Sequence, residues 1–464
     1  MAEAIHFLSL LDVSERIRRG RLSAIVLTEA MLERIAVVDP SFNSYLLVTA
    51  DLARRQARQA DAEIASGRWR GPLHGVPIAV KDLCFTAGIP TTFGMKVYEG
   101  FVPDADGTVV KRLADAGSVL LGKLHLHEGA FGEHHASTKT PLNPWNKAYW
   151  PGGSSSGSGI ATAAGLCFGS LGSDTGGSIR FPSNACGVTG LKPTWGRVSR
   201  HGAFPLAESL DTLGPMTRTA ADAAAMLTAI AGHDPADPTS LSAPVPDYLA
   251  ALDGVWGARG LTIGIDRSYV GSPVDAEVLA VVEAALEVLA RIGARVVSVE
   301  MPDVRPVAEG QLSFCEVESA TFHEAAYRAT PELFGVLLGK AVAHGLAHDP
   351  LVYARHQMER DRFKGRLARL FDEIDALIVP VSPRVGIRYD AFDEFMNDIA
   401  GQLRFTGPFN MAGNPTLTLP GGLSSGGLPI GFQLVGPHLS EAKLLAAGHA
   451  LQMASDWHLR RPPV

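Results

Sequence analysis

Short apolar runs alternate with amphipathic stretches along most of this chain, which is typical of α/β proteins. Residues 76–80 (VPIAV) predict a buried strand, 108–116 a helix that ends at Gly117, and 118–121 (SVLL) a second strand. Strand, helix and strand in this order predict a parallel pair. Lys81 then lies at the carboxyl end of the first strand, where open α/β sheets form their sites.

The strand, helix and strand pattern returns later in the chain. A strand at 261–266 precedes a helix over 272–292, opened by Ser272-Pro273 and stopped by a glycine, and a strand at 295–299. Further apolar runs predict strands at 187–191, 376–381, 416–419 and 431–435, with the last two as a closing pair.

Residues 1–70 predict an outer helical layer. Ser23 is placed to cap a helix that ends at Pro40, and residues 51–66 form a charged, alanine-rich helix that closes at a glycine. No Pro/Gly/Ser linker separates self-contained blocks in the 464 residues, so we expect one domain over 1–464.

The stretch from Gly152 to Arg180 has a composition that core packing does not explain. Sixteen of its 29 residues are glycine or serine. Glycine lets backbone N–H groups converge on a negatively charged group. Asp174-Thr175-Gly176-Gly177-Ser178 ends in a hydroxyl that could attack a carbonyl while the adjacent amides hold the oxyanion. This layout favours an acyl-transfer site.

Two upstream positions complete the candidate chemistry. Gly152-Gly153-Ser154 offers a second glycine-flanked hydroxyl, and the run GVPIAVKD delivers Lys81 to the end of an apolar segment. A lysine away from water can lose its proton and act as a base, which needs its pKa to fall from about 10.4 to near 7. Asp82 follows Lys81, and on a strand it would point to the opposite face.

The chain resembles the amidase signature family. The matching motifs are GVPIAVKD (75–82), PGGSSSGSG (151–159), GSDTGGSIRFPSNACGVTGLKPTWGRVS (172–199), FNMAGNPTLTLP and PIGFQLVGP. Agreement is dense over 75–215 and weaker along nearly the whole chain. The resemblance implies an α/β fold with a mixed central sheet of about ten or eleven strands flanked by helices, a core at 75–215, and a C-terminal portion at 216–464 that completes the sheet and the pocket.

The resemblance also implies the site. Ser178 would be the nucleophile, Ser154 the bridging serine held by a cis peptide, and Lys81 the terminal base. The backbone N–H groups expected to form the oxyanion hole belong to Thr175, Gly176, Gly177 and Ser178. No metal or other cofactor is expected.

Three neighbours of the relay are expected to support it. Asp174 and Arg180 flank the nucleophile and would pair with each other or brace the loop. Ser155 is either a supporting hydroxyl or the cap of the following helix.

The implied reaction is hydrolysis of a C–N amide bond, which releases a carboxylic acid and an amine or ammonia. Esters and carbamates such as urethanes pass through the same oxyanion. Family members commonly carry a bulky residue after His-Glu, where this chain has Gly129, so we expect a roomy pocket for bulky acyl or aryl groups. The residues expected to bind substrate are Glu128, Gly129, Ala130, Phe131 and Gly153, and further pocket candidates are Trp150, Phe314, Cys315, Phe405 and Met411.

Composition and charge limit the classes of binding partner that we expect. A net charge of −7 without a long basic run argues against nucleic acid and anionic membranes, so we expect a small-molecule substrate. No apolar run is long enough for a membrane span and the first residues lack signal-peptide features. The four cysteines contain no CxxC pair, which predicts free thiols and a cytoplasmic location. A homodimer is compatible with the sequence.

Several alternatives stay open. His125 and His127 could supply ligands for a metal-dependent amidohydrolase. The glutamine-hydrolysing component of a tRNA-dependent amidotransferase belongs to the same family, but its Lys/Arg-rich helix is not evident at 333–341. A non-catalytic scaffold would keep the same residues as struts. Two decoys are weaker: 153–157 matches GxSxG with no apolar strand before it, and Ser440 of an SxxK match looks like a helix cap.

Overall fold

The computed structural model describes residues 5–271 and 273–464. Within them, eleven strands form one continuous sheet in the order β1-β3-β2-β4-β6-β5-β10-β11-β9-β7-β8. The strands are β1 (Tyr45–Val48), β2 (Pro77–Lys81), β3 (Val119–Leu124), β4 (Gly169–Asp174), β5 (Thr189–Lys192), β6 (Thr212–Thr217), β7 (Thr262–Ile265), β8 (Arg295–Ser298), β9 (Ala376–Pro380), β10 (Thr416–Leu423) and β11 (Pro429–Val435).

The sheet is mixed, as expected. β2 runs parallel to both β3 and β4, and β7 runs parallel to β8 and β9. The strands between these two parallel groups are joined by antiparallel pairs. Because β2 and β4 are parallel neighbours, Lys81 and Asp174 end adjacent strands at the same edge of the sheet.

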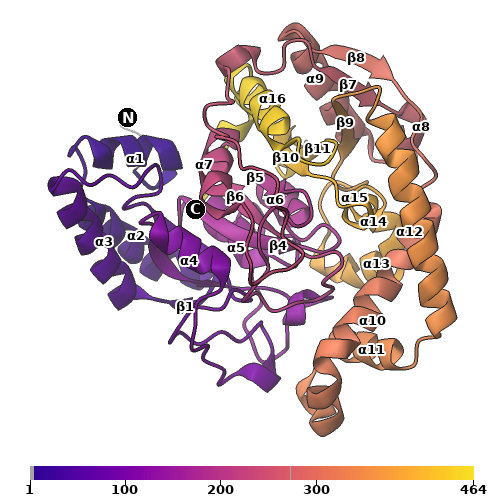
Figure 1. Cartoon of the computed structure of the whole chain (residues 1–464), viewed down its shortest axis with the longest axis horizontal. Coiled ribbons are helices and arrows are strands. Elements are labelled where there is room, and N and C mark those ends of the chain that lie inside the picture. The colour runs from indigo at the N-terminus through magenta and orange to yellow at the C-terminus, as the bar shows by residue number, and fades with distance from the viewer. Residues whose placement is uncertain (1–4, 272) are drawn as a thin grey trace.

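Helices flank the sheet. In Figure 1 the N-terminal helices lie on the left, α10 and α11 lie at the lower right, and α12 runs along the right side. The helices are α1 (Leu10–Arg18), α2 (Ala24–Val38), α3 (Ala50–Ala65), α4 (Thr108–Asp115), α5 (Ser156–Ala163), α6 (Arg180–Cys186), α7 (Ala220–Ile230), α8 (Arg267–Gly271), α9 (Ala276–Arg291), α10 (Arg305–Ala329), α11 (Val336–Leu346), α12 (Pro350–Leu370), α13 (Phe392–Asn397), α14 (Ile399–Leu403), α15 (Gly407–Ala412) and α16 (Glu441–Met453).

Glycines on β4 allow helices to approach both faces of the sheet. A Cβ at Gly169 would lie 2.5 Å from Met226 Sδ on α7, and a Cβ at Gly172 would lie 3.0 Å from Ser155 Oγ beside α5. These two positions face opposite sides of the strand. Close packing on both faces therefore explains part of the glycine content of this stretch.

The structure corrects several local predictions. The pair β10 and β11 lies inside the sheet and does not close it, because β11 also pairs with β9. The helix expected from 272 begins at Ala276; Ser272 lies outside the described residues. The strands β1, β4 and β6 were not predicted.

Two serines occupy helix N-cap positions without capping through their side chains. Ser23 Oγ donates to Asp61 Oδ2 (2.6 Å), and the Asp61 carboxylate accepts the first amides of α2 instead. Ser440 Oγ donates to the Pro437 carbonyl (2.7 Å), although Ser440 does precede α16. The sequence therefore predicts that these serines precede a helix, but it does not predict which group accepts hydrogen bonds from the first amides of that helix.

No described helix combines the length and apolar character that crossing a membrane requires.

Candidate active site

Lys81 is the last residue of β2 and is completely buried. Its Nζ donates to Ser154 Oγ (2.7 Å) and to Ser173 Oγ on the parallel neighbour β4 (2.8 Å). Among the described residues no carboxylate lies within ion-pair distance of this amine. Burial lowers the pKa of Lys81 to about 7, against weaker opposing effects from Cys84, Asp211 and Asp174.

The neighbouring carboxylate is held away from this amine. Asp82 Oδ1 lies 3.1 Å from Lys123 Nζ, and its Oδ2 accepts hydrogen bonds from the backbone and side chain of Thr92, both 2.8 Å. Asp82 therefore serves a separate buried pair, as the alternation of side chains along a strand predicts.

Ser154 lies in a tight turn before α5. The Gly153–Ser154 peptide is cis, as the family resemblance implies. The Ser154 carbonyl accepts from the His127 amide (3.1 Å), and the His127 ring covers Gly153 so closely that a Cβ there would lie 2.1 Å from Cε1. Only glycine fits at position 153.

Ser155 precedes α5 but does not cap it. Its Oγ donates to the Ser173 carbonyl (3.1 Å) and accepts from the Ser173 amide (3.2 Å). The Ser155 side chain thus ties the turn that carries Ser154 to β4, which is the supporting alternative of the two predicted for it.

Ser178 lies in the loop between β4 and α6 and is partly exposed. Its hydroxyl has no hydrogen-bond partner among the described residues, and it borders the same cavity as Ser154. The Gly177 amide donates to Asp174 Oδ1 (2.8 Å), so this predicted oxyanion donor is already engaged. The amides of Thr175, Gly176 and Ser178 donate to no described residue.

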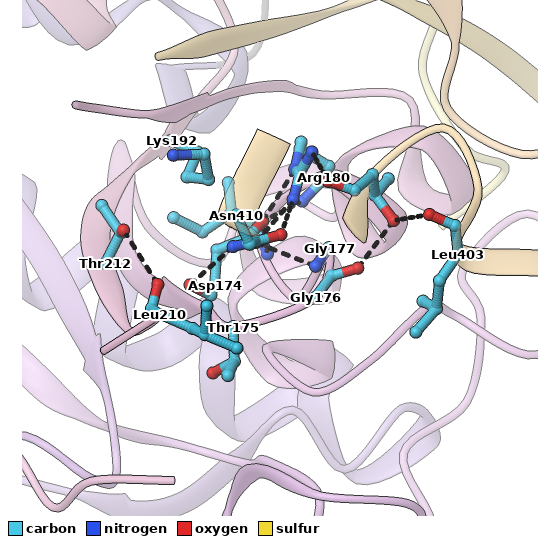
Figure 2. A network of polar contacts seen from close by, with 12 residues as sticks. Asp174, Thr175, Gly176, Gly177, Arg180, Lys192, Leu210, Thr212, Leu403 and Asn410 are labelled. Carbon is cyan, nitrogen blue, oxygen red and sulfur yellow. Dashed lines mark hydrogen bonds and ion pairs between the residues drawn. The ribbon is translucent and has the colours of Figure 1, made fainter. Parts of the chain in front are cut away.

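Asp174 and Arg180 form a completely buried ion pair beneath this loop, with Nη2 to Oδ1 at 2.8 Å and Nε to Oδ2 at 3.0 Å. Figure 2 shows Asp174 between Arg180, Asn410 and the Gly177 amide. Burial raises the pKa of Asp174, but the charge and hydrogen bonds of Arg180 outweigh this effect and hold the pKa below its usual value.

Replacing Arg180 with methionine should lower the free energy of unfolding by about 3–5 kcal/mol, because it leaves the Asp174 carboxylate buried without its partner. Arg328→Met, which breaks an exposed pair with Glu324, should change it by less than about 1 kcal/mol. Urea unfolding of both variants checks this. Equal losses would contradict the assignment of Arg180 as the brace of the loop.

A cavity of about 310 Å³ opens in front of the two serines. Trp150, Phe181 and Phe395 form an aromatic wall, with ring centroids 5.2 Å apart for Trp150 and Phe395 and 6.0 Å apart for Trp150 and Phe181. Helices α10 and α11 line another side, including Leu312 and Leu337. The cavity is therefore mostly apolar.

Five of the residues expected at the substrate line this cavity, and five do not. Those that line it are Ala130, Phe131, Trp150, Gly153 and Cys315. Those outside the lining are Glu128, Gly129, Phe314, Phe405 and Met411. Phe314, for example, packs against Tyr353 and the Arg360 guanidinium.

The prediction that Gly129 widens the pocket is wrong. Its φ is +53°, and a Cβ there would lie 2.9 Å from Leu338 Cδ2, within the core and outside the cavity lining. Glu128 is also buried, and its carboxylate accepts from the Gly335 amide at the start of α11 (2.9 Å). Burial raises the pKa of Glu128 to about 7. Glu128 thus anchors the start of α11, and Gly129 leaves room for Leu338 of that helix.

Sequence reasoning missed Ser173 and most of the pocket. Ser173 lies inside a glycine-rich motif without a chemical signal of its own, and its position two residues along β4 from Leu171 places it beside the end of β2. The pocket residues on α10, α13 and α14 carry no local signal, because an apolar residue on a helix gives the same pattern whether it faces a core or a cavity.

The described residues contain no group of three or more His, Cys, Asp or Glu side chains arranged to hold a metal ion. The His125 and His127 rings each lie against His134, and His134 Nε2 is 2.8 Å from Ser156 Oγ. Burial lowers the pKa values of His125 and His127 to about 4 and about 3. The geometry gives the metal alternative no support.

The Amidase family model matches residues 26–445, and the chain therefore belongs to the amidase family. It is 43% identical to AmiD of Mycobacterium tuberculosis over 100% of this chain and 97% of that protein. The peptide amidase of Stenotrophomonas maltophilia has a TM-score of 0.85 at 34% identity, covering 100% of this chain and 99% of that one.

A glutamyl-tRNA(Gln) amidotransferase component of Chloroflexus aggregans is also similar, with 39% identity over 99% of this chain and 98% of that protein. Family membership, relatives and solved structures agree on the class of reaction. The protein is an amidohydrolase that cleaves C–N amide bonds.

Proposed function

We propose that Ser178 is the nucleophile of this amidase and that Lys81 activates it through Ser154. The observation that carries the proposal is the Lys81 Nζ to Ser154 Oγ distance of 2.7 Å at a buried amine without an acidic partner among the described residues. A pKa near 7 leaves a large share of this amine neutral at neutral pH, which a base requires.

In the proposed acylation, neutral Lys81 takes a proton from Ser154, Ser154 takes one from Ser178, and Ser178 Oγ bonds to the substrate carbonyl carbon. The amides of Thr175, Gly176 and Ser178 stabilise the oxyanion. The oxyanion collapses, the C–N bond breaks, Ser154 gives its proton to the leaving amine, and Lys81 returns a proton to Ser154 and is neutral again. Water then attacks the acyl-enzyme through the same relay and releases the acid.

The aromatic wall supports a substrate with an apolar, bulky or aryl acyl group. Trp150, Phe181 and Phe395 present ring surface beside the proposed nucleophile, and a cavity of about 310 Å³ suits a small molecule. Esters and carbamates with the same acyl group fit the proposal, because they pass through the same oxyanion.

Phe395→Ala should weaken selection for aryl acyl groups. Loss of ring surface in the wall is expected to lower kcat/KM for an aryl amide such as benzamide by about 10-fold or more, while propionamide changes by less than about 3-fold. Phe322→Ala, at a partly exposed phenylalanine of α10 outside the cavity lining, is the control. Equal losses on both amides would contradict an acyl-binding wall.

A panel of aryl, fatty and peptide amides, esters and carbamates, assayed with wild type and Ser178→Ala, tests the proposed function. We expect hydrolysis of at least one apolar amide by wild type and none by the variant. Hydrolysis that survives in Ser178→Ala would overturn the proposal, as would cleavage of glutamine, added to the panel, with no cleavage of any other substrate.

A role in a tRNA-dependent amidotransferase is the second candidate, favoured by the 39% identity to the Chloroflexus aggregans protein. The aromatic wall favours an apolar acyl group over a glutamine side chain, although Glu316 and Lys340 also line the cavity. A pull-down that recovered a stoichiometric partner protein would favour this second candidate instead.

We further propose that residues 1–464 act as one domain in a reducing compartment such as the cytoplasm. One sheet uses strands from Tyr45 to Val435, and all four cysteines are buried free thiols. A single cooperative unfolding transition is the expected result for one domain. A homodimer stays a hypothesis that sedimentation velocity tests.

A further inference from the structure

In the loop at 175–178 the backbone carbonyls are hydrogen-bonded, whereas most of the backbone amides are not. All four of its carbonyls accept hydrogen bonds, whereas three of its four amides donate to no described residue. The carbonyl donors are Gln311 Nε2 to Thr175 (3.1 Å), Thr406 Oγ1 to Gly176 (2.6 Å), the Phe181 amide to Gly177 (2.7 Å) and the Ser155 amide to Ser178 (3.2 Å).

In a trans peptide the carbonyl and the N–H of one unit point in opposite directions. Holding a carbonyl therefore fixes the direction of the amide on the next residue. Gln311 holds the Thr175 carbonyl and so aims the Gly176 N–H. Asn410 Nδ2 donates to the Asp174 carbonyl (3.2 Å) and so aims the Thr175 N–H. The Phe181 amide does the same for the Ser178 N–H.

We propose that Gln311 and Asn410 are positioning residues of the oxyanion hole, each holding the carbonyl of a peptide unit whose N–H faces the acyl oxygen. This inference rests on the proposed function of Ser178. Gln311 is almost completely buried on α10, and it lines the cavity together with Leu312 and Cys315 of the same helix. One helix thus contacts the substrate and sets an oxyanion donor.

Thr406 provides a matched contrast. It holds the Gly176 carbonyl, and the N–H of that peptide unit belongs to Gly177, which donates to Asp174. Figure 2 shows the Gly177 amide turned toward Asp174, and a contact from the Gly176 carbonyl on the side of Leu403. Loss of the Thr406 hydroxyl therefore affects the peptide unit between Gly176 and Gly177. The bond from the Gly177 amide to Asp174 still orients that unit, and the unit supplies no oxyanion donor.

The test compares Gln311→Leu with Thr406→Val. Among the described residues Gln311 makes one side-chain hydrogen bond, whereas Asn410 also contacts Asp174 and Arg180, so Gln311 is the cleaner site. We expect Gln311→Leu to lower kcat by about 10-fold, below the 10²–10³-fold loss of a whole donor, with KM within about 2-fold. Thr406→Val should lower kcat by less than about 3-fold.

Inhibitor binding separates positioning from a merely structural effect. Gln311→Leu should weaken an apolar boronic acid, which forms a tetrahedral adduct on Ser178, by the same factor as kcat, and leave the affinity for the product carboxylate unchanged. If Gln311→Leu does not fold, Gln311→Met supports the same measurements. Unchanged kcat and boronate affinity, or an equal loss in Thr406→Val, would overturn the inference. Activity in Ser178→Ala would instead overturn the proposed function itself.

Discussion

Ser178→Ala is expected to lower kcat/KM for every amide substrate by about 10⁴-fold or more, because it removes the hydroxyl that is proposed to form the acyl-enzyme. The substitution removes one oxygen from a partly exposed residue whose hydroxyl bonds to no described residue. Folding should therefore be unaffected, with a thermal midpoint within about 2 °C of wild type.

The matched control is Ser137→Ala, which removes a hydroxyl from an exposed loop next to His135. We expect its kcat/KM to equal that of wild type. A fluorophosphonate should label wild type and Ser137→Ala at Ser178, identified by peptide mass spectrometry, and should not label Ser178→Ala. Labelling at Ser154 or Ser155 in place of Ser178 would contradict the assignment of the nucleophile.

Lys81→Met is expected to lower kcat/KM by about 10²–10⁴-fold, the usual contribution of a general base. Methionine has a similar length and keeps the buried site filled, but it cannot accept a proton. Lys81→Arg should lose as much activity, because a guanidinium does not deprotonate in this range. A loss of less than about 10-fold in both variants would show that another base activates Ser154.

The stability of Lys81→Met has a defined pH dependence. The pKa of Lys81 is about 7 in the folded protein and 10.5 in its ordinary state, so between these values the unfolded chain binds more protons. Wild type should therefore gain stability as pH rises from about 7 to about 10.5, relative to Lys81→Met. Urea unfolding at about pH 7 and about pH 9.5 measures this gain, and a constant difference would mean that the Lys81 pKa is not lowered.

The sequence predicted the parts of the molecule that have a local pattern. The parallel pair β2 and β3, the helix between them and the unit from β7 to β8 follow from apolar runs and glycine stops. Lys81 at a strand end follows from the same reasoning. The strand β6 was missed because TLGPMT contains a glycine and a proline, which argue against a buried strand, and its neighbours in the sheet supply the missing support.

The active site also has parts that a local sequence pattern predicts and parts that it does not. The motifs place Lys81, Ser154 and Ser178, and the structure brings Lys81 and Ser154 into contact and sets Ser178 on the same cavity. Which backbone N–H groups of the loop at 175–178 point towards the cavity depends on side chains that are remote in sequence. Gln311 and Asn410 follow the loop by more than 130 residues, and a polar residue on a helix gives no sign of the carbonyl that it will meet.

Gly129 shows the limit of reasoning from residue size. A small residue enlarges a pocket only if its Cβ direction points into that pocket, and backbone geometry sets this direction. At Gly129 the positive φ turns the missing side chain toward Leu338 and the core. The pocket is instead shaped by α10, α13 and α14, whose packing over the serines is a tertiary property.

The central claim is that a neutral Lys81 activates Ser178, and the rate of fluorophosphonate labelling measured against pH tests it most directly, because labelling needs no leaving amine. Lys192→Met is the control, since burial also lowers the pKa of Lys192 to about 7, but its amine bonds only to the Pro193 carbonyl among the described residues. The account predicts that labelling of wild type and Lys192→Met rises about tenfold per pH unit up to a plateau near pH 7, and that Lys81→Met labels slowly without this rise. A rate independent of pH in wild type, or the same rise retained in Lys81→Met, would contradict it.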